Sequence, residues 1–166
     1  MNKGKIVLIC GKIGSGKTTY ANKICKELNA VNFSQDEPNI TIFGTDFYLE
    51  QPDLFSKYSD KICEWVQTKA LEIAQAGANV VIENGVWTKQ ERDYLKKFYR
   101  DGGVNCELHY IDTPEEQRLL NIKKRNQQII NGKLDFYLVQ EKDIYHDFEV
   151  PSDDEIDVKI GNNFLD

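Results

Sequence analysis

Apolar and polar residues follow two different periods along the chain, which predict strands and helices in alternation. Short runs rich in valine and isoleucine indicate buried strands, at 5–10, 39–43, 79–83, 104–111 and 155–160. Segments with apolar residues three or four positions apart indicate helices with one buried face, at 18–28, 61–76, 88–100, 113–130 and 134–146. The polar stretch at 31–39 is predicted to be a surface loop.

Two of the predicted helices begin with a recognisable cap. Thr88 and Glu91 form one capping-box pattern, in which a hydroxyl and a carboxylate each bind the other residue's backbone N–H group. Thr113 and Glu116 form a second, with Pro114 at the first helical position. Strands that alternate with helices require a parallel sheet covered on both faces, so the predicted fold class is α/β with right-handed crossovers.

The length, charge and cysteine content limit the number of domains and the kinds of partner that we expect. A chain of 166 residues has room for one domain with a proper core, and we expect a single domain over residues 1–166. The net charge of −6 disfavours a broad nucleic-acid or membrane footprint, so nucleic acid is an unlikely partner. The four cysteines include no CxxC pair, which argues against zinc and against a disulfide framework. No run reaches the length of a signal peptide or a membrane span, which predicts a cytoplasmic protein without a membrane partner.

The most specific motif lies between the first predicted strand and the first predicted helix. Residues 11–18 match the P-loop pattern G-x-x-x-x-G-K-[ST] at every fixed position. In such loops the backbone N–H groups and the helix N-terminus surround phosphate oxygens, while Lys17 reaches the β- and γ-phosphates and Thr18 coordinates Mg²⁺. The motif therefore predicts binding of a nucleoside triphosphate with Mg²⁺. The expected contacts are Gly11, Ile13, Gly14, Ser15, Gly16, Lys17, Thr18 and Thr19.

Two acidic residues follow predicted strands at the edge where α/β sheets bind ligands. Asp46 comes just after the strand expected at 39–43, and is a candidate for accepting the proton of a substrate hydroxyl. Its alternative role is an ordinary helix cap or turn. Glu83 ends the strand at 79–83, which resembles a Walker B strand, and is a candidate metal ligand. Its alternative role is to cap the turn with Asn84.

Basic and aromatic residues supply further candidates. Arg118 and Arg125 lie two turns apart on one helical face, which suits a lid near 114–135 that neutralises charge on the transferred phosphoryl group. The alternative is a solvated basic face. Arg92 is either a ligand for an anionic substrate group or a surface arginine. Tyr48 and Trp87 follow strand ends, where they would line a substrate pocket or belong to the core. The two histidines lack metal-ligand spacing.

Five blocks in one order carry a resemblance to a known family. They are residues 11–19, 44–48, 82–92, 112–126 and 148–155. This order resembles the small bacterial P-loop kinases, including relatives of zeta toxin, chloramphenicol phosphotransferase and gluconate kinase. It is most similar to the branch described as AAA-type ATP-binding proteins or predicted kinases.

The resemblance implies a fold, a cofactor and several roles. The implied fold is a three-layer α/β/α, nucleoside-kinase-like P-loop NTPase fold whose five-stranded parallel sheet has the order 2-3-1-4-5. The implied cofactors are ATP and Mg²⁺, with Asp46 as catalytic base, Arg125 as lid arginine and adenine contacts around Asn162. The family strand usually ends in Asp where this chain has Glu83.

These observations predict a kinase that transfers the γ-phosphate of MgATP to a hydroxyl of a small molecule. One alternative is a regulatory P-loop NTPase or nucleotide-binding module whose output is a conformational change. Another is a polynucleotide 5′-kinase, which the acidic charge disfavours because nucleic-acid affinity needs several phosphate-neutralising cations. Fold does not fix the acceptor, so the sequence leaves it open.

Overall fold

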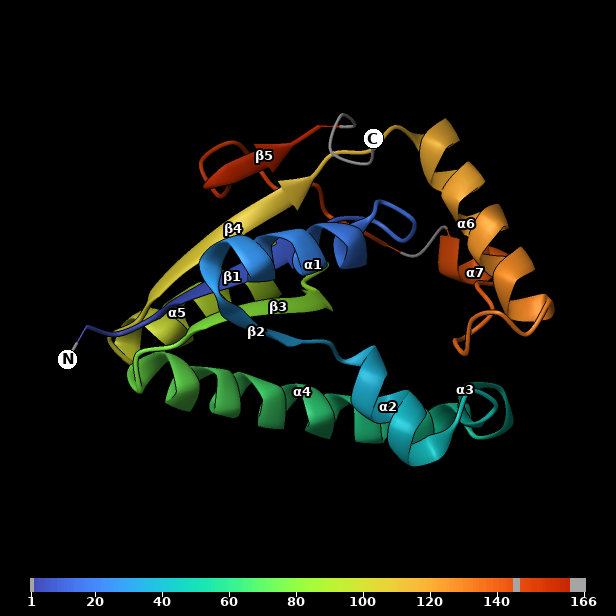
Figure 1. Cartoon of the computed structure of the whole chain (residues 1–166), viewed down its shortest axis with the longest axis horizontal. Helices are drawn as coiled ribbons and strands as arrows, with labels where there is room; N and C mark the ends of the chain where they lie inside the picture. The colour runs from blue at the N-terminus through green and yellow to red at the C-terminus, as the bar shows by residue number, and fades with distance from the viewer. Residues whose placement is uncertain (1, 145–146, 162–166) are drawn as a thin grey trace.

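A single five-stranded sheet organises the molecule (Figure 1). The computed structural model describes residues 2–144 and 147–161. Every strand pairs in parallel, in the order β2-β3-β1-β4-β5, which confirms the predicted sheet and its strand order. The strands are β1 (Lys5–Cys10), β2 (Ala30–Phe33), β3 (Asn79–Gly85), β4 (Asn105–Ile111) and β5 (Val158–Ile160).

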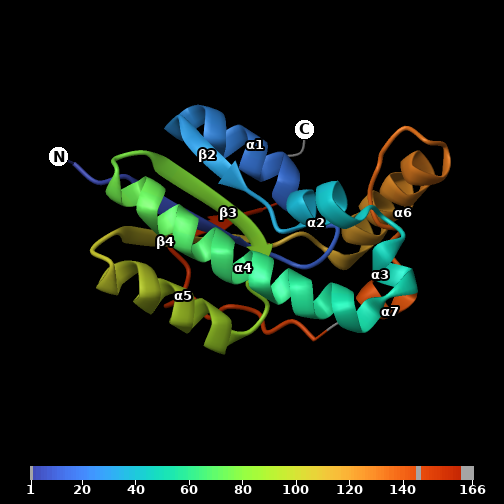
Figure 2. The same ribbon diagram turned by 90° about the horizontal axis from the view of Figure 1, so that it is seen from below.

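Helices cover both faces of the sheet and extend past one end of it. They are α1 (Lys17–Leu28), α2 (Asp36–Phe43), α3 (Phe47–Glu50), α4 (Pro52–Gln75), α5 (Lys89–Asp101), α6 (Glu115–Ile130) and α7 (Glu141–Ile144). Helix α1 lies on one face, and α4 and α5 lie on the other (Figures 1 and 2). Helices α2, α3, α6 and α7 gather beyond the carboxyl ends of the strands. None of the described helices combines the length and apolarity that a membrane crossing requires.

The alternation of side chains along β1 produces two cores. Ile6 and Leu8 pack into a cluster that includes Val66 of α4 and Leu95 of α5. Val7, one position away, belongs to the opposite cluster with α1. Because successive strand residues point to opposite faces, a strand buried on both faces must be apolar throughout, which explains the unbroken apolar run. Each fully buried aliphatic side chain contributes roughly 1.5–3 kcal/mol of transfer free energy.

The second strand is not where the sequence pattern put it. Residues 39–43 were expected to form a strand, but they belong to helix α2, and β2 is formed by Ala30–Phe33 inside the predicted loop. The position beside β3 is occupied by Ala30–Phe33, which register against Asn79–Ile82. The helix has local support, since Asp36 and Glu37 occupy its first turn and Gly44 follows it at φ 77°.

The predicted helix at 134–146 is also wrong over its described part. Only Glu141–Ile144 is helical, and residues 133–140 form an irregular segment. Asn126 of α6 holds this segment through both of its side-chain amide atoms: Nδ2 donates to the Val139 carbonyl (2.9 Å) and Oδ1 accepts from the Val139 N–H (3.1 Å). The helix predicted at 61–76 is longer than expected, because α4 begins at Pro52.

Candidate active site

The P-loop joins the end of β1 to the start of α1. Gly14 and Gly16 have φ angles of 79° and 95°, a region that glycine enters without a Cβ penalty. The Lys17 ammonium group donates to the carbonyls of Gly11 (2.8 Å) and Lys12 (3.2 Å) within its own loop. The lysine is therefore folded over the loop, next to the helix N-terminus where a phosphate group would bind.

Side chains that follow β4 hold the loop in place. Arg118 Nε donates to the Ile13 carbonyl and Asn121 Nδ2 donates to the Gly14 carbonyl, both at 2.9 Å. The Thr113 hydroxyl donates to the Ser15 carbonyl, also at 2.9 Å. A Cβ atom on Gly14 would lie 2.7 Å from the Arg118 carbonyl oxygen, so α6 approaches the loop too closely for any other residue. The predicted lid helix is thus also a support for the phosphate loop.

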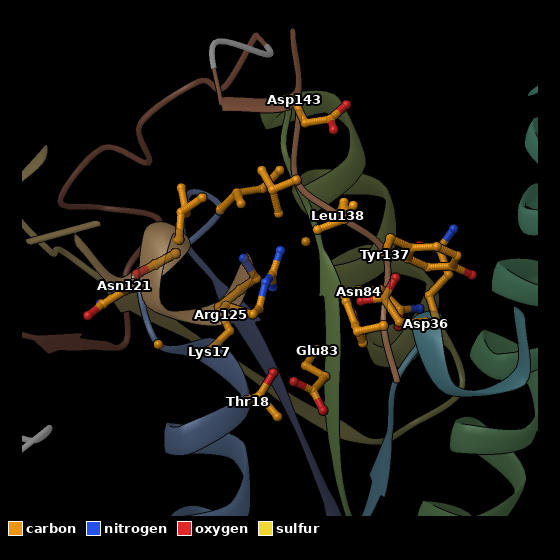
Figure 3. Close-up of a pocket in the computed structure, with 18 of the residues that line it drawn as sticks. Lys17, Thr18, Asp36, Glu83, Asn84, Asn121, Arg125, Tyr137, Leu138 and Asp143 are labelled. Atoms are coloured by element: carbon orange, nitrogen blue, oxygen red, sulfur yellow. Dashed lines mark hydrogen bonds between the residues drawn. The ribbon is translucent and has the colours of Figure 1, made fainter. Parts of the chain in front are cut away.

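A cavity of about 920 Å³ opens beside Lys17 and Thr18 (Figure 3). Its walls come from the carboxyl end of β3, the start of α2, helices α3 and α4, helix α6 and residues 136–139. The cavity extends well beyond the phosphate loop. It can therefore accommodate a second molecule next to a bound nucleotide.

Three charged side chains face this cavity and influence one another. Burial lowers the pKa of Lys17 to about 8, a shift that Asp36 opposes. Burial also raises the pKa of Asp36, while Lys17 and Arg125 act in the opposite direction. The pKa of Arg125 is lowered by burial, and its guanidinium lies 4.9 Å from the Phe136 ring centroid. Two cations and one carboxylate therefore line the cavity, with Lys17 and Arg125 close together and Asp36 across from them (Figure 3).

Two side chains with oxygen atoms that could bind a metal ion, Thr18 of α1 and Glu83 of β3, lie at the base of the cavity (Figure 3). Glu83 accepts a hydrogen bond from Asn32 Nδ2 (2.8 Å), and the Thr18 side chain lies close enough to lower the pKa of Glu83. Burial raises the pKa of Glu83, and both of these contacts oppose that shift. A hydroxyl and a carboxylate beside a phosphate loop are the hard oxygen ligands that suit Mg²⁺. The residues present therefore fit the metal ion implied by the P-loop.

Asp46 does not line this cavity. It is exposed at the N-cap position of the four-residue helix α3, but its side chain makes no capping hydrogen bond there. Its expected role depended on a strand at 39–43, and that stretch is helical. Asp36, which the sequence reasoning missed, is the acid that follows the actual β2 and faces Lys17. The same strand-end rule would have found Asp36 had Ala30–Phe33 been recognised as the strand.

Arg92 is not available to a substrate. Its side chain is 1% exposed and forms an ion pair with Glu155, Nε to Oε2 at 2.8 Å. It also donates through Nη1 to the carbonyls of Trp87 (3.2 Å) and Glu149 (2.9 Å). These contacts tie α5 to residues 149–155, so the role of Arg92 in this structure is to join two segments. The prediction that Arg92 holds an anionic substrate group is therefore wrong, and so is the alternative of a surface arginine, because the side chain is buried and paired with Glu155.

The other predicted residues fall into three groups. Tyr48 and Trp87 line the cavity as expected, together with Lys17, Thr18, Glu83 and Arg125. Arg118 binds the P-loop backbone and lines a separate cavity of about 280 Å³ on the far side of Lys12. Asn162, expected near adenine, lies outside the described residues. Asn84 and Tyr137 also line the main cavity. Asn84 lies in the block 82–92 but was given no site role, and Tyr137 belongs to none of the blocks that carry the resemblance.

Several solved structures share this fold, among them two that are named as kinases. An APS kinase from Mycobacterium tuberculosis, solved with AMPPNP and APS, is 18% identical with a TM-score of 0.69, over 98% of this chain and 91% of that one. A putative kinase from Chloroflexus aurantiacus is 11% identical with a TM-score of 0.72, over 99% and 88% of the two chains. A chain of the Pnkp1/Rnl/Hen1 RNA repair complex is 20% identical with a TM-score of 0.65, over 77% and 39%.

The sequence itself matches a family model. No curated protein matches it at a significant level. The model described as "AAA domain" matches residues 6–135, which include the P-loop, β3 and all of α6. Because that match spans most of the chain and the sheet has the P-loop kinase order, the protein belongs to the AAA domain family and has the fold of the P-loop kinases.

Proposed function

We propose that this protein transfers the γ-phosphoryl group of MgATP to a hydroxyl group of a small molecule. The observation that carries the proposal is the meeting of Asp36, Lys17 and Arg125 at the mouth of a cavity that continues past the phosphate loop. A module that only binds nucleotide needs no such space and no acid there. A kinase needs both.

Asp36 is the proposed general base. A carboxylate that accepts the proton of an attacking hydroxyl must lie near the γ-phosphate and must be ionised. Burial raises the pKa of Asp36 towards the working range, and the neighbouring Lys17 and Arg125 favour the ionised form. Lys17 and Arg125 would stabilise charge on the transferred phosphoryl group.

The nucleotide would lie along the P-loop, with its base on the other side from the acceptor. The cavity of about 280 Å³ lined by Lys12, Thr113, Arg118 and Lys159 adjoins the loop there and is the proposed adenine site. Thr18, with Glu83 in support, would hold Mg²⁺, which would supply positive charge to stabilise the phosphate groups. These side chains orient the phosphates without themselves reacting.

The test compares two aspartates ten positions apart, of which one faces the cavity and one does not. Asp36→Asn should leave MgATP affinity unchanged or tighter, because a negative charge is removed beside Lys17. Turnover should fall by about 10²–10⁴-fold, the usual contribution of positioned proton transfer. Asp46→Asn should keep normal turnover. The measurements are ADP release with mixed hydroxyl acceptors, calorimetry of MgATP binding, and a thermal melt of each variant.

Other outcomes would indicate a different catalytic base or a different function. Normal turnover by a stable Asp36→Asn protein would remove Asp36 as the base, and loss of activity in Asp46→Asn alone would restore the original assignment. Slow ATP hydrolysis that no acceptor stimulates would favour the regulatory NTPase. Stimulation by short oligonucleotides alone would favour a polynucleotide kinase, a possibility kept open by the similarity to a chain of an RNA repair complex.

A further inference from the structure

The far half of the cavity has an aromatic wall, formed by Tyr48, Phe55 and Tyr137. The Tyr48 and Phe55 ring centroids are 5.2 Å apart, and both lie within 5.8 Å of Tyr137. The rings come from α3, α4 and the segment 133–140, so three separate parts of the chain converge here. Aromatic faces bind flat or ring-shaped molecules through their apolar surfaces.

Three of the side chains that line the cavity carry a buried polar atom without a hydrogen-bond partner. Among the described residues, Tyr137 Oη, Asn84 Oδ1 and Arg125 Nε are buried and accept or donate no hydrogen bond. Buried polar groups are nearly always paired in folded proteins, so three in one cavity call for a ligand. Together they supply a hydrogen-bond acceptor, a donor and a hydroxyl that can be either. Figure 3 shows Asn84, Asp36 and Tyr137 on the same side of the cavity.

The charges of the cavity argue against an anionic acceptor. Its cations are Lys17, Lys124 and Arg125. Lys17 and Arg125 face the phosphate site, and Lys124 is an exposed residue of α6. Arg92 of α5 is not available to a ligand either, because it forms an ion pair with Glu155.

The acceptor side has two carboxylates and an exposed cation, Lys142, which lies 5.1 Å from the Tyr48 ring centroid. Asp36 lies beside the site of transfer, and Asp143 accepts a hydrogen bond from the Tyr48 hydroxyl at 2.8 Å. Once a triphosphate occupies the loop, no buried cation among the described lining residues is left for a carboxylate or phosphate on the second substrate. An anion would instead meet Asp36 and Asp143 in a partly dry site, where like charges repel strongly.

We infer that the acceptor is an uncharged or cationic ring compound with several hydroxyl groups, of the size of a nucleoside, a sugar or an aminocyclitol. The ring would stack on the aromatic wall, and its hydroxyl groups would pair with Asn84 and Tyr137. One hydroxyl would point to Asp36. Its oxygen would form a bond to the γ-phosphorus as the bond to the β–γ bridging oxygen breaks, with its proton passing to Asp36 and ADP leaving. This inference rests on the proposed kinase function.

Matched pairs of acceptors test the inference with the wild-type protein and MgATP. The pairs are adenosine and AMP, glucose and glucose 6-phosphate, and inositol and inositol phosphate, with deoxystreptamine as the cationic member. At least one uncharged or cationic compound should raise ADP release about tenfold or more, and its anionic partner less than twofold. Preference for the anionic member of a pair would overturn the inference. Stimulation only by compounds without a ring would also overturn it, as would the absence of stimulation by every ring compound.

A variant series separates this inference from the kinase proposal. Tyr137→Leu removes both ring and hydroxyl, and should raise the acceptor KM about tenfold with the ATP KM unchanged. Tyr137→Phe keeps the ring and should raise it about threefold. Tyr94→Leu, an exposed tyrosine on α5, is the matched control. If Asp36→Asn abolishes turnover while Tyr137→Leu leaves the acceptor KM unchanged, the kinase proposal stands and the aromatic site does not. A thermal melt, with Tyr48→Phe as a milder second variant, guards against misfolding.

Discussion

At the residue scale, Lys17 shows how one side chain can make nucleotide binding depend on pH. Partial burial lowers its pKa to about 8, because removal from water disfavours the charged ammonium group. Bound phosphates have the opposite effect, since they stabilise the ammonium. Below about pH 8 the lysine is already charged when ATP arrives. Above that pH, binding must first draw a proton from solution, and the affinity falls.

We therefore predict that the Kd of MgATP rises between pH 7 and pH 9.5, steepening above about pH 8 to approach tenfold per pH unit. Calorimetry at pH 8, in two buffers with different ionisation enthalpies, should reveal net uptake of protons on binding. Lys17→Met should bind MgATP weakly and should lose the proton uptake. An affinity that stays constant across this range would mean that Lys17 is charged throughout.

At the element scale, α6 has two separate attachments. Its first half binds the P-loop through Arg118 and Asn121, and its second half binds the segment 133–140 through Asn126. The segment in turn carries Tyr137 to the aromatic wall and Phe136 to Arg125. Arg118 and Asn121 therefore act on the nucleotide side, and Asn126 acts on the segment that carries Tyr137.

Asn126→Ala should loosen the acceptor side alone. The Val139 N–H and carbonyl lose their partner, and amide exchange at Val139 should become faster by about tenfold or more, as expected for loss of a hydrogen bond worth about 1–3 kcal/mol. MgATP affinity should change less than twofold. Gln127→Ala, at an exposed position of the same turn, is the control. Unchanged exchange at Val139, or an equal loss of ATP binding, would contradict this division of α6.

At the scale of the whole molecule, the Arg92–Glu155 pair joins segments far apart in the chain. Glu155 is 7% exposed, and it also accepts hydrogen bonds from the backbone N–H and hydroxyl of Ser152, both at 3.0 Å. The hydrogen bond from Arg92 lowers the pKa of Glu155 to about 2. This contribution to stability is present above the ordinary glutamate pKa of 4.5 and is lost as the pH falls towards 2.

Arg92→Met should destabilise the fold by about 3–5 kcal/mol, because it leaves Glu155 as an unpaired buried charge. Changing both residues, Arg92→Met with Glu155→Leu, should recover much of that loss, since a buried pair replaced by apolar groups is often neutral. Denaturant unfolding at pH 7 measures both. The ATP and acceptor KM values of folded Arg92→Met should match those of the wild type. A stable variant with a raised acceptor KM would instead support the original substrate role.

The sequence by itself determined the architecture and the phosphate site. The P-loop is contiguous, so residues 11–18 alone predict phosphate binding, and the helix that follows is predicted from local periodicity. The strands buried on both faces, such as Lys5–Cys10, are apolar throughout because no exposed face remains to take polar residues. Contiguous motifs and central strands are local properties, which explains why they could be predicted.

The second strand and the acceptor half of the cavity were decided only by the tertiary structure. Residues 39–43 have β-branched side chains typical of a strand, but a strand needs a partner, and Ala30–Phe33 already pairs with β3 at the sheet edge. Because the second strand is Ala30–Phe33 and not residues 39–43, the acidic residue that follows it is Asp36 and not Asp46. Asn84, Tyr137 and Asp143 share no sequence spacing, and they meet because β3, the segment 133–140 and α7 converge at one end of the sheet. Contacts between distant segments depend on packing, which local sequence patterns do not encode.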